Sequence, residues 1–251
     1  MNSIANIKTI TKRELAAYFS SPLAYVFLVI FLLLCGFFTF FFQTGLGTYF
    51  KRGDASLVTF FIWHPLFYLF LVPAVGMRLW AEERRVGTLE LLLTMPITPW
   101  QAIVGKFLAS WLFLGLALVL TFPLWITTNY LGAPDNGVIL AAYVGSWLMA
   151  GAALAITCIT SSMTRSQVVS FIVSFVVLLI LVLAGWDPVI NMLRELGRSW
   201  MVNAVTSFSL MTHFESFQKG ILDTRDIIFF LSIMVFSLFT TSVIIRGHRA
   251  G

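Results

Sequence analysis

An uninterrupted run of twenty-two uncharged residues extends from Leu23 to Thr44. As an α-helix, this run would reach about 33 Å, which is enough to cross the hydrocarbon core of a bilayer. Other apolar segments follow it, and hydrophobic residues make up 59% of the chain whereas charged residues make up only 11%. A chain with so little polar surface cannot cover a soluble globule. The sequence therefore predicts an all-α membrane protein.

Six segments of the chain are long and apolar enough to be predicted transmembrane helices. They cover about residues 23–44, 59–79, 99–130, 137–164, 166–186 and 224–245. No segment between them has the length of an ordinary soluble domain, so we expect residues 1–251 to form a single transmembrane domain. An even number of crossings places both termini on the same side of the membrane.

Residues 3–19 are predicted to form an interfacial helix before the first span. Ile4, Ile7 and Leu15 lie near one helical face, and Lys8 and Lys12 lie largely on the opposite face. A cleaved signal peptide is the competing interpretation, because basic residues precede an apolar run. That run is too long for a signal peptide and no small-residue cleavage site follows it.

The distribution of basic residues predicts the orientation, because cytoplasmic flanks carry an excess of Lys and Arg. Ten lie on the side of the termini: Lys8, Lys12, Arg13, Arg78, Arg84, Arg85, Lys106, Arg165, Arg246 and Arg249. Six lie on the other side: Lys51, Arg52, Arg194, Arg198, Lys219 and Arg225. Both termini are therefore predicted to be cytoplasmic. The net charge of +5 reflects this topology and does not indicate a nucleic-acid partner.

The segment between the fifth and sixth spans is predicted to form two short helices in or on the outer leaflet. Apolar residues recur there at helical spacing, and the pattern Thr212 to Glu215 resembles a capping box that would begin a helix. Gly220 is a suitable residue to end that helix, and Asp223 can cap the sixth span.

Residues 82–101 form a charged and turn-rich segment between the second and third spans. Gly87 can end the preceding helix, Thr88 can cap a short new helix, and Pro96 can stop it. Residues 98–101 then supply an N-cap, a proline at the first helical position and a capping-box glutamine. A short helix held between two spans is suited to contact by a partner.

Within this short helix, Leu89, Leu92 and Leu93 make an apolar stripe, whereas Glu90 lies off the stripe. This pattern is typical of a helix that lies in a partner's groove or on a membrane surface. For each single charged residue nearby, an ordinary solvated role is the competing interpretation.

The sequence contains no recognisable catalytic motif. Gly105-Lys106 lacks the remaining residues of a P-loop, so we do not expect the chain to be an enzyme that hydrolyses ATP. The three histidines, His64, His213 and His248, are too scattered for a zinc helix. We expect no catalytic, metal or cofactor site in this chain.

Hydroxyl side chains follow one face of the fifth span at Ser166, Ser170 and Ser174. They are candidates for lining a transport path. The alternative is that each hydroxyl bonds to a carbonyl of its own helix. Small residues are frequent over residues 141–153 of the fourth span, and close helix packing is sufficient to explain them.

The run from Glu83 to Pro96, with its Gly-Thr pair, Leu-Glu-Leu-Leu sequence and later proline, resembles the segment between the second and third spans of ABC-2 type transporter permeases. Residues 12–23 resemble the family's connecting helix, and residues 209–226 look like the external segment of its gliding-motility-associated subgroup. The resemblance implies six spans, a cytoplasmic coupling helix and a location in the bacterial inner membrane.

The resemblance also implies partners: a cytoplasmic ABC ATPase that binds ATP and Mg, a second permease copy in a homodimer, and a membrane-anchored extracytoplasmic auxiliary protein. The residues that it assigns to ATPase coupling are Glu83, Arg84, Gly87, Thr88, Leu89, Glu90, Leu92, Leu93 and Pro96.

Three functions remain open from the sequence. The first is the permease subunit of an ATP-driven exporter. The second is a signalling or mechanotransmission subunit that acts on an extracytoplasmic partner without transporting a substrate. The third is a passive membrane scaffold that has no ATPase.

Overall fold

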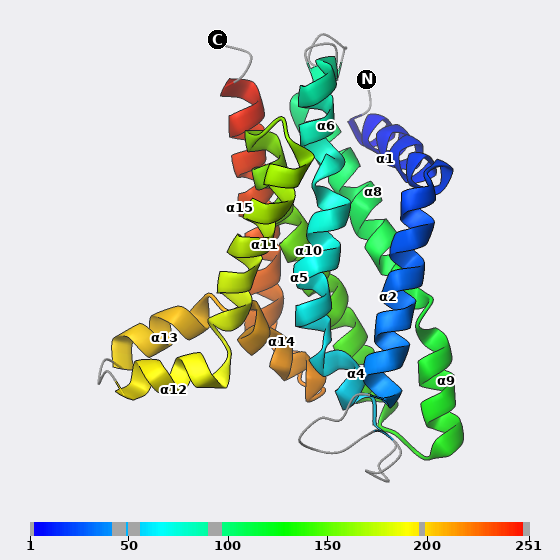
Figure 1. Ribbon diagram of the computed structural model, residues 1–251, viewed down its shortest axis with the longest axis vertical. Helices are drawn as coiled ribbons and strands as arrows, with labels where there is room; N and C mark the ends of the chain where they lie inside the picture. The colour runs from blue at the N-terminus through cyan, green and yellow to red at the C-terminus, as the bar shows by residue number, and fades with distance from the viewer. Residues whose placement is uncertain (1–2, 42–48, 50–55, 90–96, 196–198, 248–251) are drawn as a thin grey trace.

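The computed structural model describes residues 3–41, 49, 56–89, 97–195 and 199–247. Within these residues every regular element is an α-helix, and most helices run along the long axis of one elongated bundle (Figure 1). The elements are α1 (Ser3–Ser20), α2 (Pro22–Phe40), α4 (Val58–Ile62), α5 (His64–Gly76), α6 (Arg78–Val86), α8 (Pro99–Val119), α9 (Phe122–Leu131), α10 (Asn136–Met163), α11 (Gln167–Leu183), α12 (Asp187–Glu195), α13 (Ser199–Ser207), α14 (Leu210–Gln218) and α15 (Thr224–Gly247).

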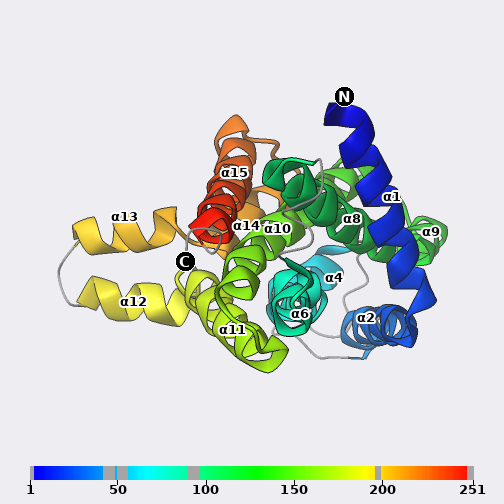
Figure 2. The ribbon, with the colours of Figure 1, turned by 90° about the horizontal axis from the view of Figure 1, so that it is seen from above.

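Helix α10 lies at the centre of the bundle, with α5, α8, α11 and α15 around it (Figure 2). The small residues of α10 allow the neighbouring helices to approach it closely, so that it can occupy the centre. A Cβ added at Gly151 would lie 2.6 Å from the Trp111 indole nitrogen, and one added at Gly145 would collide with the Phe217 ring. Ala150 is completely buried, and most residues of the helix are buried. The predicted close packing of the fourth span is therefore confirmed.

Four stretches of the described chain are long and apolar enough to cross a membrane: Pro22–Phe40, Pro99–Leu131, Asn136–Met163 and Thr224–Gly247. They correspond to the predicted spans 23–44, 99–130, 137–164 and 224–245. The predicted fifth span differs at its end, because α11 stops at Leu183 and meets α12 at an angle of 65°. If this bent pair is one crossing, the described chain has five.

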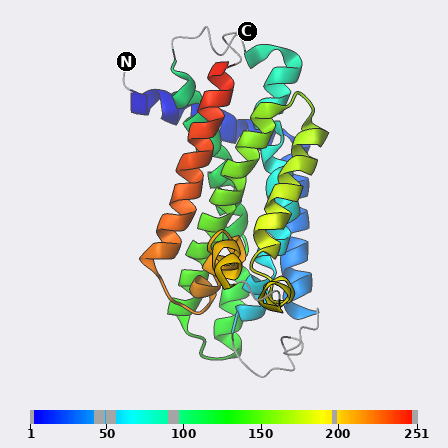
Figure 3. The same ribbon diagram turned by 90° about the vertical axis from the view of Figure 1, so that its left-hand side faces the viewer.

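The predicted second span, 59–79, is divided among α4, α5 and α6 and is not one continuous helix. Pro65 lies at the start of α5 and fits the break after α4, whereas α5 continues through Pro73. Each of the three helices alone is shorter than a membrane-spanning helix. In Figures 1 and 3, α5 and α6 nevertheless follow one another along the length of the bundle.

The segment between α11 and α15 contains three helices, α12, α13 and α14, whereas the sequence predicts two. The prediction of a capping box that starts at Thr212 is wrong. Helix α14 begins after Ser209, whose hydroxyl accepts a hydrogen bond from the Thr212 amide at 3.2 Å. Gly220 has φ +77°, as expected for a residue that ends a helix. The Asp223 carboxylate accepts from the Arg225 amide at 2.9 Å and caps α15.

The two ends of the bundle contain different elements (Figures 1 and 3). Helices α1 and α6 and the last turn of α15 lie at one end, which we call the α1–α6 end. Helices α4 and α14 and the start of α15 lie at the other, the α4–α14 end. Helix α1 and the last turn of α15 thus lie at the same end of the molecule, while the side of the membrane remains a prediction from charge.

Candidate functional site

Helix α6 positions the start of the predicted coupling segment. Its Leu79, Trp80 and Ala81 side chains are buried, while Arg85 is exposed, so the helix is amphipathic. It ends at Gly87, which has φ +78°. Glycine adopts this left-handed conformation without the steric cost that a Cβ would add. The prediction that Gly87 ends the preceding helix is confirmed.

Lys106 of α8 carries the central charge of the site. Its ammonium nitrogen lies 2.9 Å from Glu83 Oε1 and 3.5 Å from Glu14 Oε1. The Lys106 side chain is only 7% exposed, and those of Glu83 and Glu14 are 18% and 20% exposed. The Trp80 ring also lies beneath the ammonium, at 5.6 Å. One lysine therefore connects α1, α6 and α8.

The Glu83 carboxylate points into the helical bundle. One oxygen accepts from Lys106, and the other is buried without a hydrogen-bond partner among the described residues. Thr88 donates to the Glu83 carbonyl at 3.5 Å, and Leu89 is 7% exposed within the core. These three residues were assigned to ATPase coupling, and each already has an internal contact. A further contact with an ATPase remains a prediction for them.

A second set of contacts connects α6 to the central helix α10. The Arg84 guanidinium donates to the Ser162 carbonyl at 2.7 Å. Arg84, another residue assigned to ATPase coupling, therefore anchors the C-terminal end of α6 to α10.

Ser161 of α10 holds the break between α5 and α6. Its hydroxyl accepts from the Trp80 and Ala81 amides at 3.1 Å each and donates to the Met77 carbonyl at 2.9 Å. These backbone groups lose their regular helical partners because the helix is interrupted at Met77. A single hydroxyl therefore satisfies three buried backbone groups at this break.

The start of α8 is formed as the sequence predicts. Thr98 accepts from the Gln101 amide at 3.4 Å, and the Gln101 side chain accepts from the Thr98 amide at 3.3 Å. This is the predicted capping box, with Pro99 at the first helical position. The same Gln101 oxygen also accepts from Asn6 of α1 at 3.2 Å. The cap therefore fixes α1 as well as α8.

Helix α1 lies directly against α8 beyond this cap. Thr11 donates to the Gly105 carbonyl at 3.2 Å, and the Tyr18 hydroxyl lies 2.8 Å from the Ser110 hydroxyl. A Cβ at Gly105 would lie 2.7 Å from Ile10. Burial raises the pKa of Tyr18. The predicted interfacial helix is confirmed as a helix over Ser3–Ser20, and it is joined to α8 along its length.

Sequence reasoning missed the Lys106 cluster. The available signal was a lone lysine in an otherwise apolar stretch of the third span, with acidic residues on two other segments predicted at the same membrane surface. The remaining assigned coupling residues, Glu90, Leu92, Leu93 and Pro96, lie outside the described residues, and their roles remain predictions.

The three serines proposed to line a path have different environments. Ser166 is exposed and caps α11 by accepting from the Val169 amide at 3.4 Å. Ser170 and Ser174 are completely buried. Ser174 is hydrogen-bonded to Thr160 of α10 and donates to the Ser170 carbonyl at 2.7 Å. Within one copy, Ser174 faces α10 and Ser170 is enclosed, and path lining remains a prediction.

The sequence matches the family described as "ABC-2 family transporter protein" over residues 9–196. The match contains most of α1, the whole 82–101 segment and all of α11. No curated protein matches the chain. Permeases of this family are transmembrane components without an ATPase site of their own, and they work with an ABC ATPase subunit. The chain therefore belongs to the ABC-2 transporter family and is a multi-pass permease subunit of an ATP-binding cassette transporter.

Proposed function

We propose that this permease forms the membrane part of an ATP-driven exporter in the bacterial inner membrane. Two copies would pair as a homodimer, and each copy would receive force from one cytoplasmic ATPase that binds ATP and Mg. In this proposal α4, α5 and α6 together make a sixth crossing, because they follow one another along the bundle. Both termini would then be cytoplasmic, at the α1–α6 end.

The observation that carries this proposal is the set of contacts between α6 and its neighbours. Lys106 connects α6 to α1 and α8, and Ser161 and Arg84 connect it to α10. A force applied to the segment after Gly87 would therefore reach three elements of the bundle at once. Packed interfaces of this kind shift between discrete arrangements rather than deforming continuously. The break at Met77 is a suitable hinge for such a shift.

Within the 82–101 segment, we assign two kinds of role. Gly87 and Pro96 would set the angle of the coupling helix, while Glu90, Leu92 and Leu93 would contact the ATPase. Glu83 would act differently from the sequence-based expectation, because its carboxylate pairs with Lys106. Its role in this proposal is to pass the movement of α6 to α1 and α8.

The experiment measures ATP hydrolysis by the ATPase co-purified with the permease in lipid vesicles. Glu90→Arg places a like charge against the basic groove that we expect in the ATPase, so co-purification or stimulated hydrolysis should fall at least about tenfold. Lys12→Gln, an exposed charge change on α1, is the matched control. Unchanged hydrolysis in both Glu90→Arg and a deletion of residues 89–94 would contradict the coupling role.

A second candidate function is mechanotransmission to an extracytoplasmic partner without transport. It is favoured by α12 and α13, which project sideways from the bundle as a pair (Figures 1 and 2). The gliding-motility resemblance implies such a membrane-anchored auxiliary protein. The two functions differ in flux: if vesicles hydrolyse ATP and the partner changes conformation while no candidate substrate moves, mechanotransmission replaces export.

A transport path along Ser166, Ser170 and Ser174 would require movement of α11. Ser174 is hydrogen-bonded to Thr160, so Ser170 and Ser174 would face a path only after α10 and α11 separate. A cysteine placed at Ser174 should then react with a membrane-permeant thiol reagent only during ATP turnover. Equal labelling with and without ATP would contradict this part of the proposal.

A further inference from the structure

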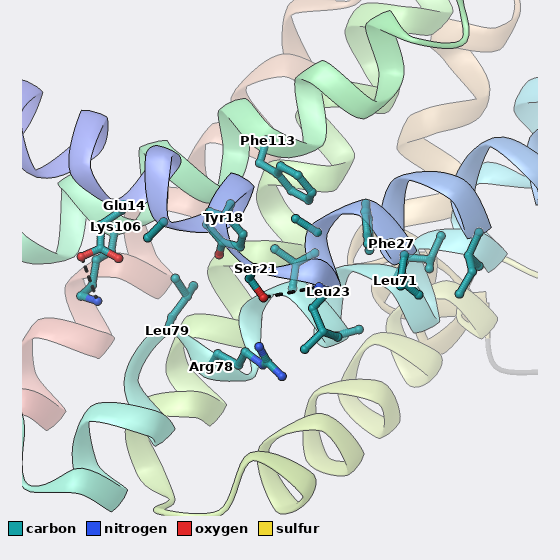
Figure 4. Close-up of a pocket in the computed structure, with 16 residues that line it drawn as sticks. Glu14, Tyr18, Ser21, Leu23, Phe27, Leu71, Arg78, Leu79, Lys106 and Phe113 are labelled. Carbon is teal, nitrogen blue, oxygen red and sulfur yellow. Dashed lines mark hydrogen bonds and ion pairs between the residues drawn. The ribbon is translucent and has the colours of Figure 1, made fainter.

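A cavity of about 310 Å³ lies in the elbow between α1 and α2, where α5 and α8 also form walls. Its volume is at the lower limit of small-molecule sites, which are about 300–1,000 Å³. Most of its lining is apolar and includes Phe27, Leu71 and Phe113. Polar groups gather toward the α1–α6 end, as Figure 4 shows. The cavity is thus amphipathic along its length.

One wall of this cavity faces outward. Leu23, Val26 and Ile30 of α2 line the cavity, yet they are 50%, 51% and 43% exposed. In a bilayer these exposed apolar side chains would contact lipid. The cavity therefore has an apolar wall that is shared with the hydrocarbon phase, which gives an acyl chain access from the side.

The charges around the cavity do not balance. Lys106 pairs with Glu83 and Glu14, and Glu14 also pairs with Arg13 at 2.7 Å, so two cations balance two carboxylates. Arg78 also lines the cavity, is exposed, and makes no hydrogen bond or ion pair with any residue in the described part of the chain. Ser21 and Leu23 line the same cavity, and in the view of Figure 4 the Arg78 guanidinium is drawn on their side and apart from the Lys106–Glu14 pair. One positive charge at the cavity is therefore left for an anion.

Ser21 supplies a second polar group beside Arg78. Its hydroxyl oxygen accepts from the Leu23 amide at 3.4 Å, and its proton has no acceptor among the described residues. A guanidinium and a hydroxyl form a suitable donor pair for a phosphate, since arginine presents parallel N–H groups that match phosphate oxygens. Basic pockets between membrane helices near the cytoplasmic surface are suited to anionic lipid headgroups.

We propose that this elbow binds one anionic phospholipid of the surrounding bilayer. Its phosphate is held by Arg78 and Ser21, and part of one acyl chain lies against Val26, Phe27, Ile30 and Leu71. The lipid thus occupies the joint between the interfacial helix α1 and the first span α2. This inference requires only that the chain lies in a bilayer, so it does not depend on export or on ATPase docking.

Binding is measured by native mass spectrometry of the purified protein, which counts retained phosphatidylglycerol and phosphatidylcholine molecules over a lipid titration. The protein should retain phosphatidylglycerol preferentially. Arg78→Gln should weaken that retention about tenfold, the loss expected for one charge-assisted contact. Arg78→Lys keeps the charge but not the paired N–H groups, and should lose less.

Two further variants separate the parts of the site. Lys12→Gln removes a nearby exposed charge that does not line the cavity, and it should bind phosphatidylglycerol like the unaltered protein. Ala74→Phe keeps Arg78 but fills the cavity wall on α5, and it should also weaken retention. Thermal unfolding of each variant confirms that it is folded.

Three results would overturn the proposal. The first is equal phosphatidylglycerol retention by Arg78→Gln and the unaltered protein, or an equal loss in Lys12→Gln. The second is undiminished retention in folded Ala74→Phe. The third is full displacement of the lipid by excess inorganic phosphate, which would indicate an anion site that does not use the acyl chain.

Discussion

The two ends of the bundle are held by different chemistry. At the α1–α6 end, Lys106 is enclosed by two carboxylates, and Ser161 satisfies three backbone groups at the broken α5–α6 junction. At the α4–α14 end, His213 Nδ1 and Asp226 Oδ1 are hydrogen-bonded at 2.6 Å beside the Phe229 ring, while α12 and α13 extend away from the bundle. The contacts at the first end join four helices. At the second end, His213 joins α14 to α15, and Gln218 joins α14 to α4 by donating to the Phe61 carbonyl at 3.3 Å.

This difference indicates which end moves as a unit. Removal of one partner from a buried ion pair leaves an uncompensated charge, so elements joined in this way separate only at high cost. The α1–α6 end should therefore respond as one piece to a force on α6. The α4–α14 end has fewer such connections and should adapt locally.

Lys106→Met should have the largest effect. It leaves the largely buried Glu83 carboxylate without its cation and leaves Glu14 only the exposed Arg13, at a cost of about 3 kcal/mol or more. Unfolding in mixed micelles with increasing sodium dodecyl sulfate measures this loss. The double variant Lys106→Met with Glu83→Gln should recover part of it. If both variants unfold like the unaltered protein, Lys106 does not join the three helices.

Ser161→Ala should come next. It leaves the Trp80 and Ala81 amides and the Met77 carbonyl without their shared partner, which should cost about 2–3 kcal/mol. Ser162→Ala is the matched control, because the Ser162 hydroxyl is equally buried but donates only to the Ile159 carbonyl of its own helix. An equal loss in both variants would argue against a special role for Ser161 at the break.

Asp226→Ala should have a smaller effect, about 1–2 kcal/mol, because it removes the hydrogen-bond partner of His213 at the α4–α14 end. Asp226→Asn retains an acceptor and should lose less. Hydrolysis by the co-purified ATPase should remain unchanged in both variants. If Asp226→Ala lowered the stability of the protein as much as Lys106→Met does, the two ends would not be mechanically distinct.

Lys219→Ala should have the smallest effect. The Lys219–Glu215 pair is 3.8 Å apart and 68% and 44% exposed, so solvent screening should limit its contribution to about 0.5 kcal/mol or less. The same micelle titration should give overlapping curves for this variant and the unaltered protein. A loss above about 1 kcal/mol would mean that exposed charges also stabilise the α4–α14 end.

The local signals in the sequence predict many helix ends correctly. Residues 98–101 form the expected capping box, Gly87 and Gly220 have the expected positive φ, and Asp223 caps α15. Each of these features depends on side chains within three residues of the backbone that they cap. The prediction that Thr212 caps α14 was wrong. Ser209 and Thr212 are both suitable caps, and sequence alone does not decide between them.

Continuity of the spans was harder to predict. Hydropathy over residues 59–79 measures apolar character, which α4, α5 and α6 share despite their breaks. A break in the hydrogen-bonding ladder is stable only where another group replaces the lost bonds. At Met77 that group is Ser161, which lies 84 positions away in the sequence. No short hydropathy window along the sequence contains both Met77 and Ser161.

The sequence by itself determined that the chain is helical, apolar and anchored in a membrane, since these properties follow from composition and from short-range capping. The family match over residues 9–196 likewise depends on residue order alone. Only the tertiary structure decided that Glu83 faces Lys106 and that Arg78, at the cavity between α1 and α2, has no ion-pair partner among the described residues. Charge pairing depends on distances between side chains from different helices, and these distances exist only once the helices pack.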